Sequence, residues 1–181
     1  MEIKIRTQST PNPYALKFVS NVTFKSSGKA TFSSPEECHH IPLALRLMQT
    51  PNVMQIHFFE NSMTLTQNGI TAWDDLSETV QRIIREEIPN HDPEFKSAEE
   101  QRRANLPEEL LEVEQILDQT IRPSLQMDGG DIEVLSLDGV TLSVRYEGAC
   151  GSCPSSTGAT LEAIQGILRE RFNENIIVQP V

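Results

Sequence analysis

Apolar and polar positions in the first half of the chain follow two periods. Alternation of apolar with polar side chains predicts β-strands at 2–7, 15–19, 53–59 and 62–66. The last two flank Glu60-Asn61, which predicts a hairpin. Apolar residues three or four apart predict a short helix that begins at Pro42 and a longer one that begins at Asp74 or Asp75. This half therefore predicts a small α+β domain at residues 1–88.

The second half shows a clearer succession of elements. Apolar residues at helical spacing between Leu110 and Ile121 predict a helix that Pro123 ends or kinks. Asp138-Gly139, a strong signal for a two-residue turn, joins strands predicted at 132–137 and 140–146. A further helix and a strand at 176–179 complete the order αββαβ. We expect a three-stranded mixed sheet with two helices, in a domain at residues 106–181.

Residues 89–105 separate the two halves. They are polar and show no apolar period, which is typical of a linker. The predicted fold class is therefore α+β, with two small α+β domains joined by this segment.

Charge and composition narrow the classes of partner. The net charge is −11, and residues 105–181 carry 13 acidic side chains against 4 basic ones. Such a surface repels phosphate groups, so we expect no nucleic-acid and no membrane partner. No run of about 18 apolar residues is present. The first residues alternate like a strand and resemble neither a signal peptide nor a transit peptide, which predicts a cytoplasmic location.

The candidate chemistry lies in one loop between a predicted strand and a predicted helix. Three cysteines are too few for a disulfide framework, and two of them, Cys150 and Cys153, form a C-x-x-C pair. Small neighbours such as Gly148 and Gly151 leave room for a metal or cluster near the backbone. The helix that follows begins close to Cys153, and its positive end lowers the pKa of a nearby thiol. The pair is therefore a candidate ligand set or a candidate nucleophile.

Three chemistries compete for this pair. A thioredoxin-like dithiol would need more chain than the 28 residues that follow Cys153. Zinc and iron–sulfur clusters both need four ligands, and every histidine lies before residue 92, so either would need two copies of the chain. No paired carboxylates, nucleophile–base set or phosphate loop indicates an enzyme. A dithiol oxidoreductase and a zinc-linked dimeric adaptor stay open as alternatives to a cluster carrier.

Three stretches of the second half resemble the NifU-like C-terminal domain of the Nfu family of iron–sulfur cluster scaffold and carrier proteins. They are Ile121-Arg122-Pro123-Ser124-Leu125, Asp128-Gly129-Gly130-Asp131 and Gly148-Ala149-Cys150-Gly151-Ser152-Cys153-Pro154-Ser155-Ser156. The resemblance implies that Cys150 and Cys153 bind a [4Fe-4S] cluster, with [2Fe-2S] as the other possibility. It also implies that the cluster bridges a homodimer, comes from upstream donors and is delivered to apo-proteins.

The first half is similar to the N-terminal domain of the same family. The stretches that carry this similarity are Thr10-Pro11-Asn12-Pro13, Leu16-Lys17-Phe18 and Pro42-Leu43-Ala44. Two groups of neighbouring residues are expected to have a structural role only. The glycines of Asp128-Gly129-Gly130-Asp131 are expected to end a helix while the aspartates hold the turn. Cys38-His39-His40 is not expected to bind metal, because adjacent side chains diverge.

Overall fold

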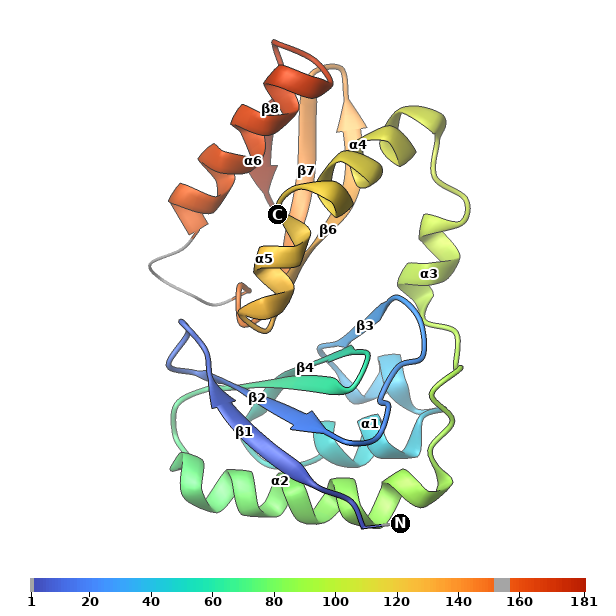
Figure 1. Cartoon of the computed structure of the whole chain (residues 1–181), viewed down its shortest axis with the longest axis vertical. Helices are drawn as coiled ribbons and strands as arrows, with labels where there is room; N and C mark the ends of the chain where they lie inside the picture. Colours follow the sequence, from blue (N-terminus) through green and yellow to red (C-terminus); the bar gives the residue numbers. More distant parts are fainter. Residues whose placement is uncertain (1, 152–156) are drawn as a thin grey trace.

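The fold is built from two β-sheets, each with its own helices (Figure 1). The structure is a computed structural model that describes residues 2–151 and 157–181, and for Thr157 the backbone only. In Figure 1 the N-terminal half is below, the C-terminal half is above, and α3 (Ala98–Arg103) lies at the side where the chain passes between them.

The N-terminal half is a five-stranded antiparallel sheet in the order β1-β2-β5-β4-β3. Its strands are β1 (Ile5–Ser9), β2 (Ala15–Ser20), β3 (Lys29–Phe32), β4 (Val53–Phe59) and β5 (Ser62–Gln67). The β4–β5 hairpin predicted around Glu60 is present, with Glu60 in a left-handed conformation (φ 49°). Strand β3 was not predicted. It is a four-residue strand at the sheet edge, too short to show alternation.

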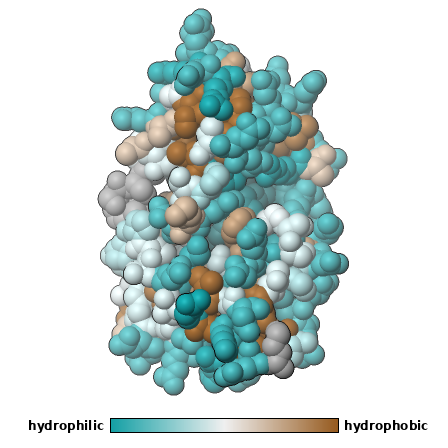
Figure 2. Space-filling model, viewed as in Figure 1, coloured by the Kyte–Doolittle hydropathy of each residue, from teal (hydrophilic) through white to brown (hydrophobic). Residues whose placement is uncertain are grey.

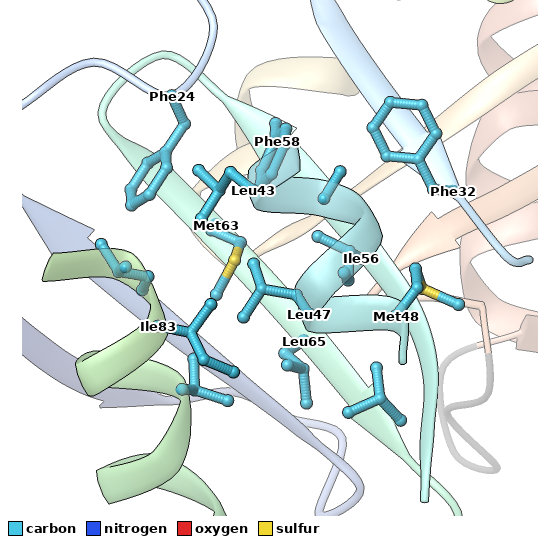
Figure 3. Close-up of a cluster of buried hydrophobic side chains, with 14 of the residues drawn as sticks. Phe24, Phe32, Leu43, Leu47, Met48, Ile56, Phe58, Met63, Leu65 and Ile83 are labelled. Atoms are coloured by element: carbon cyan, nitrogen blue, oxygen red, sulfur yellow. The ribbon is translucent and has the colours of Figure 1, made fainter. Parts of the chain in front are cut away.

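Helices α1 (Pro42–Met48) and α2 (Trp73–Glu87) pack on one face of this sheet. Figure 3 shows side chains of α1, β4 and β5 pointing toward one another, with Ile83 of α2 beside them. Met63 and Leu65 of β5 are fully buried in this core. The alternate residues of the same strand, Ser62, Thr64 and Thr66, are also buried, so the polar face of the sheet is covered as well.

Residues 89–105 contain more structure than their sequence indicated. The 3₁₀-helix η2 (Ile88–Asn90) leads into this segment, and α3 begins at a capping box formed by Ser97 and Glu100. Another 3₁₀-helix, η1 (Pro35–Cys38), lies earlier in the chain, between β3 and α1. Phe95 packs against the N-terminal core. These contacts hold the segment on the N-terminal half. The domain boundaries predicted at residues 88 and 105 stay predictions.

The C-terminal half confirms the predicted α+β class with a three-stranded mixed sheet. Its elements are α4 (Glu108–Gln119), α5 (Arg122–Met127), β6 (Gly130–Asp138), β7 (Thr141–Gly148), α6 (Thr157–Arg171) and β8 (Ile177–Pro180). Strand β7 pairs with β6 antiparallel and with β8 parallel. The structure adds α5 to the two expected helices, because Pro123 ends one helical path and occupies the first turn of the next.

The C-terminal half covers the polar face of the N-terminal sheet, on the side opposite α2 (Figure 1). Figure 2 shows a mostly hydrophilic surface in this view, with hydrophobic side chains gathered chiefly in the C-terminal half and near the lower edge. Within residues 2–151 and 157–181, no helix combines the length and apolar character needed to cross a bilayer.

Candidate metal centre

Cys150 lies in the turn that follows β7. The turn is closed by two backbone hydrogen bonds, in which the Cys150 amide donates to the Glu147 carbonyl (3.3 Å) and the Gly151 amide to the Gly148 carbonyl (3.1 Å). Cys150 is half-buried. Burial, together with the nearby Cys150 thiolate, raises the pKa of Tyr146 to about 12. Cys153 lies outside the described residues, so its role as the second ligand stays a prediction.

Glycines give the Cys150 side chain its space. Gly130 pairs with Gly148 across β6 and β7, and a Cβ added at Gly130 would overlap the Cys150 Sγ. A Cβ at Gly148 would overlap the Gly129 carbonyl oxygen, and Gly129 itself has a positive φ of 80°. The Asp128–Asp131 stretch therefore does more than end a helix, because it also forms the surface on which the cysteine sulfur rests.

Buried charges surround the base of this turn. Asp131 is fully buried and accepts hydrogen bonds from Arg122 Nε (2.8 Å) and Gln126 Nε2 (3.0 Å). Burial alone would raise the pKa of Asp131, but Lys29 and Arg122 lower it to about 2. Arg122 also donates to Glu114 (2.8 Å), so the helices α4 and α5 are tied to the start of β6.

The N-terminal half contributes directly to the surroundings of the turn. Asn12 Nδ2 donates to the Ala149 carbonyl (3.1 Å), and the Gly148 amide donates to Gln55 Oε1 (2.8 Å). Lys17 Nζ donates to the Gln126 carbonyl (3.0 Å). The sequence interpretation assigned no site role to these residues. Asn12 and Lys17 had a signal, since both lie in stretches that carry the family resemblance, whereas Gln55 had none.

An open cleft borders the turn on one side. Its volume is about 360 Å³, and its lining includes Gln55 of β4, Tyr146 of β7 and Gly151 of the turn. The turn is therefore covered by the N-terminal sheet on one side and open to solvent on another.

Cys38 lies apart from this site. Cys38 is fully buried in the N-terminal core, and burial raises the pKa of its thiol to about 11. Its Sγ faces the Ser34 and Pro35 carbonyls (3.6 Å each), whereas His39 and His40 are exposed. Within the described ranges, no three His, Cys, Asp or Glu side chains are grouped as a metal site would require.

Comparison with known families agrees with this arrangement. Residues 113–179 match the NifU-like domain, and residues 5–91 match the family described as scaffold protein Nfu/NifU N terminal. The chain belongs to the Nfu-type family of NifU-like proteins. The resemblance seen in the sequence is thereby confirmed for both halves of this Nfu-type protein.

Individual relatives cover nearly the whole chain. This Nfu-type protein is 31% identical over 174 residues to the protein named NFU1 iron-sulfur cluster scaffold homolog, mitochondrial, of Drosophila willistoni, a match covering 91% of this chain and 59% of that protein. It is 28% identical over 178 residues to NifU-like protein 5, mitochondrial, of Arabidopsis thaliana, covering 94% and 65%. A solution structure of a NifU-like protein from Saccharomyces cerevisiae is 22% identical, with a TM-score of 0.47, and covers 52% of this chain and 87% of that one.

The relatives overturn the expected cytoplasmic location, because they are named as mitochondrial proteins. The expectation rested on the first few residues, which form part of the folded sheet. A targeting segment is read separately from the folded domains, so the strand pattern there carries no information about the compartment. The chain spans about three fifths of the length of the Drosophila relatives it matches.

Proposed function

We propose that this Nfu-type protein carries an iron–sulfur cluster on the thiolates of Cys150 and Cys153 and delivers it to apo-proteins without catalytic turnover. The observation that carries the proposal is the position of Cys150. Its sulfur rests on Gly130 at the end of a hairpin, in a turn that borders an open cleft. The relatives named as iron–sulfur cluster scaffolds support the same role.

The cluster is proposed to be [4Fe-4S] and to bridge two copies of the chain. Such a cluster needs four thiolates, and the C-terminal half supplies two. A two-fold axis through the cluster provides the other pair. The open side of the turn suits this arrangement, because a shared, solvent-exposed cluster is easily released to another protein.

The test is anaerobic reconstitution of the full chain with ferrous iron, sulfide and a thiol. We expect bound iron and sulfide, a [4Fe-4S] Mössbauer spectrum, and a shift from monomer to dimer in sedimentation. Cys150→Ala and Cys153→Ala should each abolish the dimer-linked cluster. Cys38→Ala is the matched control and should load normally, since Cys38 lies in the other core. A cluster that forms equally well in Cys150→Ala would refute the proposal.

The same preparation separates the alternatives. A dithiol oxidoreductase would reduce insulin and lose this activity in Cys153→Ser. A zinc-linked adaptor would contain zinc and no iron by elemental analysis after purification without oxygen. Transfer to an apo-protein, followed as recovery of that protein's activity, tests delivery.

A further inference from the structure

Three consecutive residues before Cys150 are each bound by the N-terminal half. Lys29 of β3 binds Glu147, Gln55 of β4 accepts from the Gly148 amide, and Asn12 donates to the Ala149 carbonyl. All three contacts lie within the chain and connect residues more than 90 positions apart in the sequence. The last residues of β7 therefore rest on a surface that the C-terminal half does not itself supply.

The strand pair that carries the turn has an intrinsic weakness. Asp131 of β6 and Glu147 of β7 are direct cross-strand partners, one pair away from Gly130 and Gly148. Both are buried, with exposed fractions of 0% and 3%. Like charges directly opposite each other destabilise a strand pair, and buried charges without a partner are costly. Arg122 of the C-terminal half pairs with Asp131 (2.8 Å), so the carboxylate that needs a cation from elsewhere is Glu147.

Lys29 meets this need from the other half of the molecule. Its Nζ lies 2.5 Å from Glu147 Oε2, 3.3 Å from Asp131 Oδ1 and 2.8 Å from the Ile132 carbonyl oxygen. Burial would lower the pKa of Lys29, but these carboxylates and Glu99 outweigh burial and raise it. The ammonium group stays charged at neutral pH and bridges the two strands.

We infer that Lys29 is a positioning residue for the cysteine turn, so that the N-terminal domain sets how exposed Cys150 is and how fast a bound cluster leaves. The part about cluster release rests on the proposed function, whereas the part about exposure does not. Without Lys29 the buried Glu147 loses the cation with which it pairs, and Arg122, which is bound to Asp131, must offset both of the opposed carboxylates. The pairing that precedes Cys150 then opens, and the N-terminal sheet loses its ion pair with Glu147.

The test compares Lys29→Met with Lys25→Met in the full chain. Lys25 is a matched control, because it is equally buried in the N-terminal half but pairs with Glu100, away from the turn. The first readout is alkylation of the apo-protein by iodoacetamide, resolved by peptide mass spectrometry. The second is the rate at which a chelator removes iron from reconstituted protein.

We expect Lys29→Met to alkylate at Cys150 about ten times faster than the wild type and to lose iron faster by a similar factor. Lys25→Met should stay within about twofold on both readouts. The alkylation rate of Cys38 measures general unfolding of the N-terminal core. This rate should change by the same factor in Lys29→Met and in Lys25→Met. A Cys150 rate that is unchanged in Lys29→Met, or that rises equally in Lys25→Met, overturns the inference.

Two further variants keep the test decisive if Lys29→Met does not fold. Gln55→Ala removes the hydrogen bond that Gln55 accepts from the Gly148 amide and the one that it donates to Ser33, but leaves the ion pairs of Lys29 in place. It should accelerate Cys150 alkylation by a smaller factor, with Cys38 unaffected. Lys29→Met combined with Glu147→Gln removes both partners and should return the rate toward that of the wild type. No effect of Gln55→Ala and no recovery in the double variant would contradict the inference. A wild type that takes up no iron would refute the proposed function, while the alkylation results would still decide the role of Lys29.

Discussion

The smallest feature on which the site depends is the missing side chain of Gly130. Its φ is not positive, so its backbone needs no glycine, yet an added Cβ would occupy the place of the Cys150 sulfur. Gly129, its neighbour, has a positive φ, and a Cβ added there would lie 2.8 Å from Thr64 Oγ1 of the N-terminal sheet. The two adjacent glycines thus serve different purposes, one for the turn and one for the cysteine.

Gly130→Ala is expected to destabilise the protein by about 1–3 kcal/mol, because the methyl group must displace Cys150 or move β6 from β7. The free energy of unfolding in urea measures this loss. Gly166→Ala is the control: nothing lies within 4 Å of its Cβ position in α6, so the variant should be neutral or more stable. Equal unfolding midpoints for Gly130→Ala and the wild type would show that the turn accommodates the methyl group.

Among the elements, the short helix α3 connects the two halves by its side chains. Its N-cap Ser97 accepts from the Glu100 amide and donates to the Lys29 carbonyl (3.3 Å). At its other end Arg102 pairs with Glu133 of β6, and Arg103 pairs with Asp118 of α4. A helix this short is not stable alone, so its ends decide whether it forms.

Ser97→Ala should cost about 1 kcal/mol of unfolding free energy, since it removes the capping box and the bond to β3. Urea unfolding monitored by circular dichroism measures the change. Ser77→Ala, in the first part of α2, replaces a serine whose hydroxyl accepts a hydrogen bond from Gln81 of the same helix and should stay within about 0.5 kcal/mol. A cost for Ser97→Ala no larger than that of Ser77→Ala would mean that the cap does not hold α3.

At the scale of the whole molecule, the halves are joined by a buried network of opposite charges. Glu99 of α3 faces Lys29 of β3, Glu133 of β6 and Glu147 of β7. Burial and the two neighbouring glutamates raise the pKa of Glu99 to about 8 in spite of Lys29, and its Oε2 makes no hydrogen bond within the described structure. The folded protein therefore keeps a proton on Glu99 at pH 7 that the unfolded chain releases.

This proton makes stability fall as pH rises. Above pH 7 the unfolded carboxyl, with its ordinary pKa near 4.5, binds essentially no proton, whereas folded Glu99 loses its own as pH passes about 8. We expect the unfolding free energy to drop by about 1 kcal/mol between pH 7 and 8.5. His57 and His91, whose pKa values burial lowers, contribute little there, because unfolded histidine is mostly neutral above pH 7.

Glu99→Gln should remove this dependence, because an amide does not titrate. The measurement is urea unfolding of both proteins at half-unit steps from pH 7 to 8.5. A wild-type curve as flat as that of Glu99→Gln would show that Glu99 is already ionised in the folded protein at pH 7.

Elements with local signals could be predicted from the amino-acid sequence. The Asp138-Gly139 turn, the alternation at 53–59 and 62–66, and the helical spacing from Leu76 to Ile84 each depend on residues close in the chain, and all appear in the structure. The loop that carries Cys150, and the family to which it belongs, could also be read from neighbouring residues. Helix caps are less local: Asn105 is of a type that caps helices and lies just before α4, yet its Nδ2 donates to the Gln101 carbonyl of α3 (2.7 Å).

How the two halves pack against each other depends on contacts between residues far apart in the sequence, and it could be read from the fold alone. Thr64 and Thr66 read as the solvent face of a strand but are buried, and Lys29 reads as a surface lysine but binds two carboxylates more than 100 residues away. Neither fact has a local signal, because alternation shows that a face is polar and not what covers it. Burial of a charged side chain such as Lys29 requires partners of opposite charge, and those partners come from distant parts of the chain.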